Sequence, residues 1–143
     1  MVAIARSALV GYSVQQMFAL INDIEAYPQF MSGCIGAKIL EEGDGFVEAQ
    51  LTLGKSGIQQ HLVSRNELHP PEFMIMRLID GPFSSFEGRW QFQPLSETAC
   101  KVSLDLEFEF SNPILAMTVS QWFEQMAGEQ VDALCQRASA LYK

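Results

Sequence analysis

The sequence predicts an α+β protein in which a curved antiparallel sheet of six or seven strands wraps around a long C-terminal helix. Residues 102–110 alternate between apolar and polar side chains, which is typical of a strand with one buried face. From Pro113 to Tyr142, apolar residues recur at three- and four-residue steps, which predicts an amphipathic helix. Because the apolar face of the sheet needs a cover, we expect this helix to pack against it.

One strand and one or two short helices are predicted before the main sheet. Residues 4–10 form the strand. Ser13, with Gln16 three residues later, makes a capping box that starts the first helix. Pro28 restricts the segment 24–30, because the residue before a proline is driven toward extended geometry. We therefore expect this segment to belong neither to the first helix nor to the sheet.

Six further strands follow, and turn residues separate them at the short intervals that favour an antiparallel meander. Glycine-containing turns at 42–45 and 54–57 join the first three strands. Pro70 and Pro71 end the third of them, because proline donates no hydrogen bond to a neighbouring strand. An Asp-Gly-Pro turn at 80–82 joins the fourth to a fifth strand that is rich in aromatic residues. The six predicted strands are residues 35–41, 46–53, 58–68, 73–79, 86–92 and 100–110.

Asn112 and Pro113 mark the start of the C-terminal helix, as N-cap and first helical residue. An unbroken helix from there to Tyr142 would be about 45 Å long. Gly128 is a weak helix former, so we expect a bend there or a close approach to the sheet. The apolar stripe of the helix is formed by Leu115, Val119, Trp122, Phe123, Met126, Leu134, Ala138 and Leu141.

Length and composition favour one domain over residues 1–143 with a sizeable hydrophobic core. Hydrophobic residues make up 48% of the chain and charged residues 18%, as in globular proteins. No apolar run approaches the ~20 residues that a membrane-spanning helix needs. The N-terminus lacks the basic and apolar regions of a secretion signal. We therefore expect a cytoplasmic protein with no transmembrane segment.

Charge and cysteine content exclude several kinds of site. The net charge is −8, from 9 basic and 17 acidic residues, and no two basic residues are adjacent. This argues against a phosphate-binding surface, and we predict no DNA partner. Cys34, Cys100 and Cys135 are odd in number and form no CxxC pair, so we expect buried free thiols instead of a disulfide framework or a metal site.

The sequence contains no recognisable set of catalytic residues. It has no Gly-x-Ser-x-Gly elbow, phosphate-binding loop or dinucleotide fingerprint. His61 and His69 lie eight residues apart with no third ligand nearby, so no metal site is predicted. Asp105, Glu107 and Glu109 alternate with apolar residues, which places them on the solvent face. We therefore predict no catalytic residue, no metal and no required cofactor.

Two arginines lie inside predicted strands among apolar neighbours. Arg77 is expected to face solvent, because Met74, Met76 and Leu78 form a consistent inner face. Two interpretations remain open for Arg65. An outward salt bridge is favoured, and an inward side chain that orients a quinone carbonyl or a lipid head group is the alternative.

Four segments resemble the START-like superfamily of polyketide cyclase and coenzyme Q-binding proteins, and within it the bacterial ribosome association toxin RatA family. They lie in the same order over nearly the whole chain. They are residues 6–13 (RSALVGYS), residues 27–30 (YPQF) with Cys34 beyond, residues 64–66 (SRN), and residues 80–83 (DGPF) with 88–95 (GRWQFQPL). The resemblance implies a helix-grip fold with a hydrophobic tunnel that binds a polyprenyl quinone, such as ubiquinone, or another lipid.

A ligand pocket is also suggested by the methionine and aromatic content, although these side chains could equally pack the core. Methionine is adaptable and suits a flexible apolar pocket. We expect Tyr27 and Phe30 at its mouth, on the proline-containing segment. The other predicted ligand-binding residues are Leu51, Leu62, Met76, Leu78, Trp90, Leu106, Trp122 and Met126.

Two functional hypotheses follow from the resemblance. The first is non-enzymatic binding of a quinone or another lipid that supports respiratory quinone function, with transient membrane contact. The second is a RatA-type toxin of a toxin–antitoxin system that binds the large ribosomal subunit and blocks subunit association. The acidic charge argues against direct RNA contact in this second role. A cyclase-type enzyme ranks third, because no acid–base pair can be placed inside the cavity.

Overall fold

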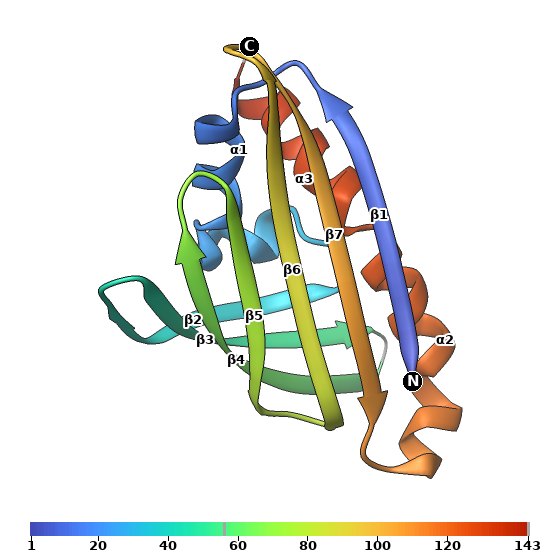
Figure 1. Ribbon diagram of the computed structural model, residues 1–143. Coiled ribbons are helices and arrows are strands. Elements are labelled where there is room, and N and C mark those ends of the chain that lie inside the picture. Colours follow the sequence, from blue (N-terminus) through green and yellow to red (C-terminus); the bar gives the residue numbers. More distant parts are fainter. Residues whose placement is uncertain (56, 143) are drawn as a thin grey trace.

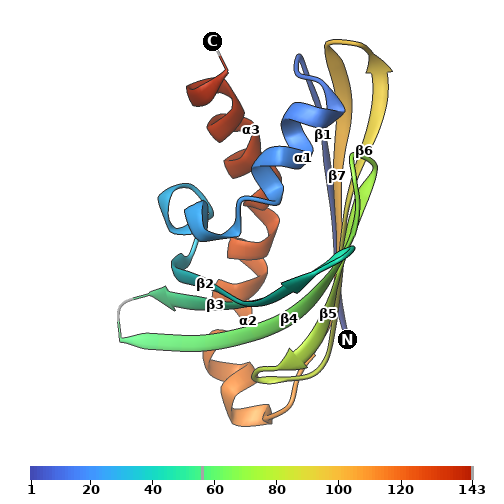
Figure 2. The same cartoon turned by 90° about the vertical axis from the view of Figure 1, so that its left-hand side faces the viewer.

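The computed structural model describes residues 1–55 and 57–142, and in it a seven-stranded antiparallel sheet packs against helices (Figure 1). The strand order is β1-β7-β6-β5-β4-β3-β2, so hairpins join all neighbours except β1 and β7. Figure 2 shows β2, β3 and β4 bending away from β1 and passing around the C-terminal helices. The predicted helix-grip fold is confirmed. The strands are β1 (Val2–Val10), β2 (Cys34–Gly43), β3 (Phe46–Lys55), β4 (Ile58–His69), β5 (Phe73–Asp80), β6 (Phe83–Ser96) and β7 (Ala99–Phe110).

These strands contain all seven predicted ones, each extended by one to four residues at one or both ends. In the predicted turn at 54–57, Ser56 lies outside the described residues. The alternation in β7 is confirmed, because Val102, Leu104, Leu106 and Phe108 are buried. The acidic residues between them are exposed, as predicted. The concave face of the sheet is therefore apolar along β7.

Two short helices connect β1 to β2. The predicted capping box starts α1 (Val14–Ile21): the Gln16 backbone N–H donates to Ser13 Oγ at 3.1 Å, and the Ser13 N–H donates to Gln16 Oε1 at 2.9 Å. The segment at 24–30 belongs neither to α1 nor to the sheet, as expected, and most of it forms a short 3₁₀ helix of its own, η1 (Ile24–Gln29), with Pro28 inside it. Proline is compatible with such a turn because its fixed φ lies in the helical range.

The C-terminal helix is not a single unbroken helix of about 45 Å: it is interrupted beside Gly128, where a bend or a close approach was expected. It consists of α2 (Pro113–Gly128) and α3 (Gln130–Leu141), and α2 is capped by Asn112 as predicted. The break comes directly after Gly128, the predicted weak point. At Gly128 a Cβ atom would lie 3.3 Å from Nη2 of Arg6 on β1, which confirms the expected close approach to the sheet. The carboxyl end of α2 favours a positive charge at this place.

Phenylalanine side chains fasten α2 to the sheet. The ring of Phe123 on α2 lies 4.8 Å from that of Phe108 and 5.3 Å from that of Phe83, measured between centroids. Both contacts are edge-to-face, a favoured geometry for aromatic pairs. This aromatic cluster sets the distance between α2 and the sheet, and the pocket lies next to the cluster.

Candidate ligand-binding pocket

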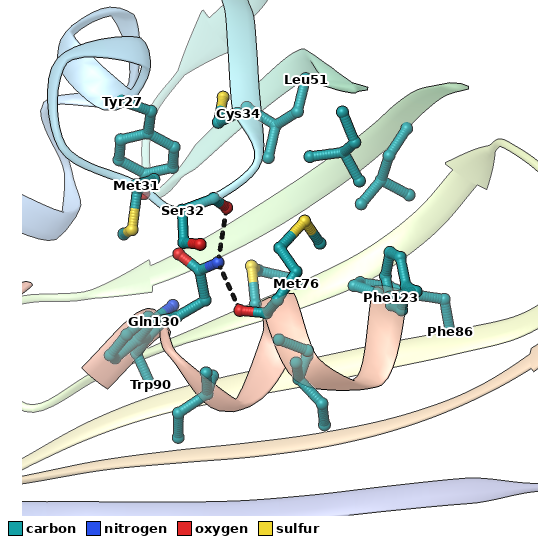
Figure 3. Close-up of a pocket in the computed structure, with 16 residues that line it drawn as sticks. Tyr27, Met31, Ser32, Cys34, Leu51, Met76, Phe86, Trp90, Phe123 and Gln130 are labelled. Atoms are coloured by element: carbon teal, nitrogen blue, oxygen red, sulfur yellow. Dashed lines mark hydrogen bonds between the residues drawn. The ribbon is translucent and has the colours of Figure 1, made fainter. Parts of the chain in front are cut away.

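An apolar pocket of about 80 Å³ lies between the concave face of the sheet, the α2–α3 break and the segment that links η1 to β2 (Figure 3). Strands β3 to β7 supply its floor, and α2 supplies one wall. Its sixteen lining residues are Tyr27, Met31, Ser32, Cys34, Leu51, Leu53, Leu62, Met76, Phe86, Trp90, Leu104, Leu106, Phe123, Met126, Ala127 and Gln130. Its volume is small compared with the roughly 300–1,000 Å³ of most ligand sites.

The structure brings most of the predicted ligand-binding residues together in this pocket. They come from five strands, from η1 and from α2, which are far apart in sequence. Their role in binding a ligand stays a prediction. The predicted residues found in the lining are Tyr27, Leu51, Leu62, Met76, Trp90, Leu106 and Met126.

Leu78 and Trp122 were predicted to line the pocket and do not; Phe30, predicted at its mouth, lies beside the lining residue Tyr27 without belonging to the lining. The Phe30 ring centroid lies 5.7 Å from that of Tyr27 and 5.2 Å from the Arg137 guanidinium carbon, so Phe30 packs between Tyr27 and α3. Leu78 packs against the core further along β5. Trp122 lines a smaller neighbouring hollow, because successive helical residues point about 100° apart and the next residue, Phe123, takes the wall position.

Nine lining residues were not predicted. The signal for Leu53 and Leu104 was present, since each lies two positions from a predicted residue on the same face of its strand. Ser32 and Gln130 had no such signal, because only the helix break brings α3 beside the segment before β2. The other unpredicted residues are Met31, Cys34, Phe86, Phe123 and Ala127.

A hydrogen-bonded latch holds the segment before β2 against the helix break. Nε2 of Gln130 donates to the Ser32 carbonyl oxygen at 2.8 Å and to the Met126 carbonyl oxygen at 2.9 Å, as Figure 3 shows. The Ser32 hydroxyl donates to Oε2 of Glu129 at 3.4 Å. These bonds close one side of the pocket, so a large ligand requires this segment to move.

Gly33 allows the latched segment to approach α2. Its φ is +76°, and a Cβ atom would overlap the side chain of Met126. We expect Gly33→Ala to lower the free energy of unfolding by about 2–3 kcal/mol, from left-handed strain together with the overlap. Gly45→Ala is the matched control, since φ there is +77° and the Cβ atom would meet open space. Urea unfolding of both variants measures the difference, and equal losses would contradict the overlap.

The pocket carries no ionised group at neutral pH. None of its sixteen lining residues, all within the described part of the chain, is Asp, Glu, Lys, Arg or His. Burial raises the pKa of the Tyr27 hydroxyl, which donates to the Ile21 carbonyl oxygen. Burial also raises the pKa of the Cys34 thiol, which donates a hydrogen bond to the Gly36 carbonyl oxygen at 3.3 Å. Both groups therefore stay neutral, and the lining offers no general acid–base pair for catalysis.

Both arginines singled out in the strands face away from the pocket. Arg77 bonds Glu67 at 2.9 Å and Glu87 at 2.7 Å on the solvent face, as predicted. Arg65 donates to Glu48 Oε1 at 2.9 Å, which confirms the outward interpretation and excludes the inward one.

The remaining candidate ligating and reactive groups lie outside the pocket, with one exception. His61 and His69 are exposed, and the described residues hold no group of three side chains arranged to bind a metal. All three cysteines are free; Cys100 and the pocket residue Cys34 are buried, while Cys135 is half-buried.

No helix among the described residues is long and apolar enough to cross a membrane.

Two buried polar side chains lie close to the pocket. Ser64 Oγ donates to Asn66 Oδ1 at 2.9 Å, and both residues are almost fully buried on β4. Asn66 pairs in register with the lining residue Met76. This pair of polar residues therefore lies on a strand that also supplies Leu62 to the lining, beside the lining residue Met76.

The chain matches the family described as polyketide cyclase / dehydrase and lipid transport over residues 10–135. It is 40% identical to the ribosome association toxin RatA of Escherichia coli (strain K12), over 97% of this chain and 88% of that protein. It is 26% identical to the mitochondrial coenzyme Q-binding protein COQ10 homolog B of Xenopus laevis, over 96% of this chain and 58% of that protein.

Solved structures share this fold. The Zhui aromatase/cyclase from Streptomyces sp. R1128 superposes with a TM-score of 0.88 at 17% identity, covering 99% of this chain and 96% of that one. A START superfamily protein from Mycobacterium smegmatis superposes with a TM-score of 0.78 at 24% identity, covering 97% of this chain and 98% of that one. At these identities the likeness establishes the architecture alone.

Proposed function

The chain belongs to the polyketide cyclase / dehydrase and lipid transport family, and we propose that it binds a hydrophobic ligand in its apolar pocket without transforming it. The observation that supports this proposal is the uncharged lining, which joins side chains from most of the sheet to α2. A concave apolar site with a few polar groups is the usual form of a small-molecule site. A polyprenyl quinone is the favoured ligand, because a coenzyme Q-binding protein is among the relatives.

Size restricts how such a ligand binds. The pocket of about 80 Å³ is too small for a whole polyprenyl quinone. Met31, Met76 and Met126 line it, and their unbranched side chains can change rotamer to widen it. Release of the Gln130 latch would open it further. We therefore expect the quinone ring to enter the pocket while most of the tail stays outside or at the opened side.

Native mass spectrometry tests the proposal on protein purified from its own host, with extraction and identification of any bound lipid. We expect either an endogenous hydrophobic ligand or uptake of an added short-chain ubiquinone at one molecule per chain. Unchanged quinone during incubation supports a non-enzymatic role, and a modified product contradicts it. If the purified protein carries no lipid and takes up no added quinone, the proposal that it binds a hydrophobic ligand is wrong.

A ribosome-directed role is the second candidate, and the 40% identity to RatA over nearly the whole chain favours it. In this role the protein binds the large ribosomal subunit in the cytoplasm and blocks subunit association. With a net charge of −8, contact through ribosomal protein is favoured over contact with RNA phosphates. Binding would then fall only gently as the salt concentration rises.

Sedimentation distinguishes the two roles. Overexpression should shift ribosome profiles toward free subunits, and the protein should co-sediment with large subunits, if the second role is right. Co-sedimentation without any lipid or quinone binding would favour the ribosome role alone. Lipid binding with undisturbed ribosome profiles would favour the first role alone.

A further inference from the structure

We infer that the pocket selects an uncharged ligand with a carbonyl head group, and that the indole N–H of Trp90 donates a hydrogen bond to that carbonyl. This inference rests on the proposed function, since it concerns which ligands the pocket accepts. Two properties of the pocket lining support the inference. One is the position of the polar side chains, and the other is the absence of charged side chains.

The pocket has an aromatic end and a polar end. Phe86 and Phe123 lie on one side of it in Figure 3, and Trp90 and Gln130 lie on the other. The strand and helix geometry agrees with this view. Trp90 follows Phe86 by four residues on β6, about 13 Å in a strand. Gln130 follows Phe123 by seven residues, about 10 Å in a helix.

The polar end keeps unused hydrogen-bonding capacity. Trp90 is only 3% exposed, yet no hydrogen bond among the described residues involves its indole N–H. Gln130 uses its amide nitrogen for the latch, so its side-chain carbonyl remains an acceptor only. The Trp90 N–H is therefore the donor that the lining can offer to a ligand oxygen, and a ketone or quinone carbonyl matches it.

An anionic head group has no partner at this end. The lining holds no cation. Two charged groups lie at the helix break, both outside the lining: the exposed Glu129 carboxylate accepts from Ser32, and the Arg6 guanidinium lies against Gly128. Arg137 is directed to Gln29 and to the Phe30 ring, outside the lining. A carboxylate or phosphate in the pocket would be buried without a cation from the lining to pair with it, which is strongly unfavourable.

Three probes of equal carbon number test this selectivity in wild-type protein: methyl nonyl ketone, undecanoate and undecane. We expect calorimetric titration to show the ketone binding at least about tenfold more tightly than undecanoate. Undecanoate binding as tightly as the ketone would overturn the inference while leaving hydrophobic binding intact. Binding of none of the three would overturn both the inference and the proposed function.

Trp90→Phe tests the donor, because it removes the N–H and keeps an aromatic ring. Ketone affinity should fall about tenfold, the value of one hydrogen bond to a buried group. Undecane affinity should change much less. Trp122→Phe is the matched control, since Trp122 lies outside the pocket lining and both affinities should hold. Equal losses for ketone and undecane in Trp90→Phe would show that Trp90 only shapes the pocket, against the inference.

Discussion

Leu106→Trp is expected to abolish binding of a short-chain quinone while the protein remains folded. Leu106 is buried on β7 and lines the pocket. Its Cδ2 atom would lie 2.7 Å from a Cβ atom at Gly88, so the leucine already uses the space that this glycine leaves. An indole at position 106 would fill much of the about 80 Å³ that a ligand needs. Overpacking of this kind costs about 1–3 kcal/mol of stability.

Retention of quinone through gel filtration, followed by its absorbance, measures the effect. Leu9→Trp is the matched control, because Leu9 is 72% exposed on β1 and the same substitution there leaves the pocket untouched. Urea unfolding of both variants establishes that each is folded. If the folded Leu106→Trp variant retains as much quinone as the wild-type protein, the ligand binds elsewhere. Ribosome profiles of the same variant show whether the second role depends on a filled pocket.

Local patterns in the sequence predicted the strands and the helix starts, because those features depend on neighbouring residues. The alternation in 102–110 predicted the buried face of β7, and Ser13 and Asn112 predicted two helix starts. Each signal has a local physical cause, either side-chain alternation or a capped N–H group. Elements of this kind can be predicted without knowledge of the tertiary structure.

The pocket was only partly predictable because it depends on how distant elements meet. The chain breaks its last helix at Glu129, and this break brings Gln130 to Ser32, nearly a hundred residues away in sequence. Periodicity placed both Trp122 and Phe123 on the apolar stripe, but only the packing of α2 against the sheet decides which one faces the pocket. Helix orientation about its own axis is a tertiary property, so the sequence pattern left it open.

Trp90→Ala is expected to lower the free energy of unfolding by about 3–5 kcal/mol, the usual loss when a buried aromatic side chain is removed. Trp90 is 3% exposed and pairs in register with Met74 on one side and Leu104 on the other, both almost fully buried. Their side chains cannot collapse into the gap without disturbing the central strands. Trp122→Ala is the control, and because Trp122 is only partly buried the loss there should be smaller.

Urea unfolding measures both losses, provided that the free energy of unfolding falls with urea concentration at the same slope in each variant. A loss for Trp90→Ala below that for Trp122→Ala would contradict the central position of Trp90. This cost also determines how the ligand must be studied. The alanine variant loses the indole surface that lines the pocket, the indole N–H and part of its stability. A loss of ligand binding in this variant would therefore have several explanations. The Trp90→Phe variant retains an aromatic ring beside Met74 and Leu104, so a loss of ketone affinity that exceeds the loss of undecane affinity reports on the N–H.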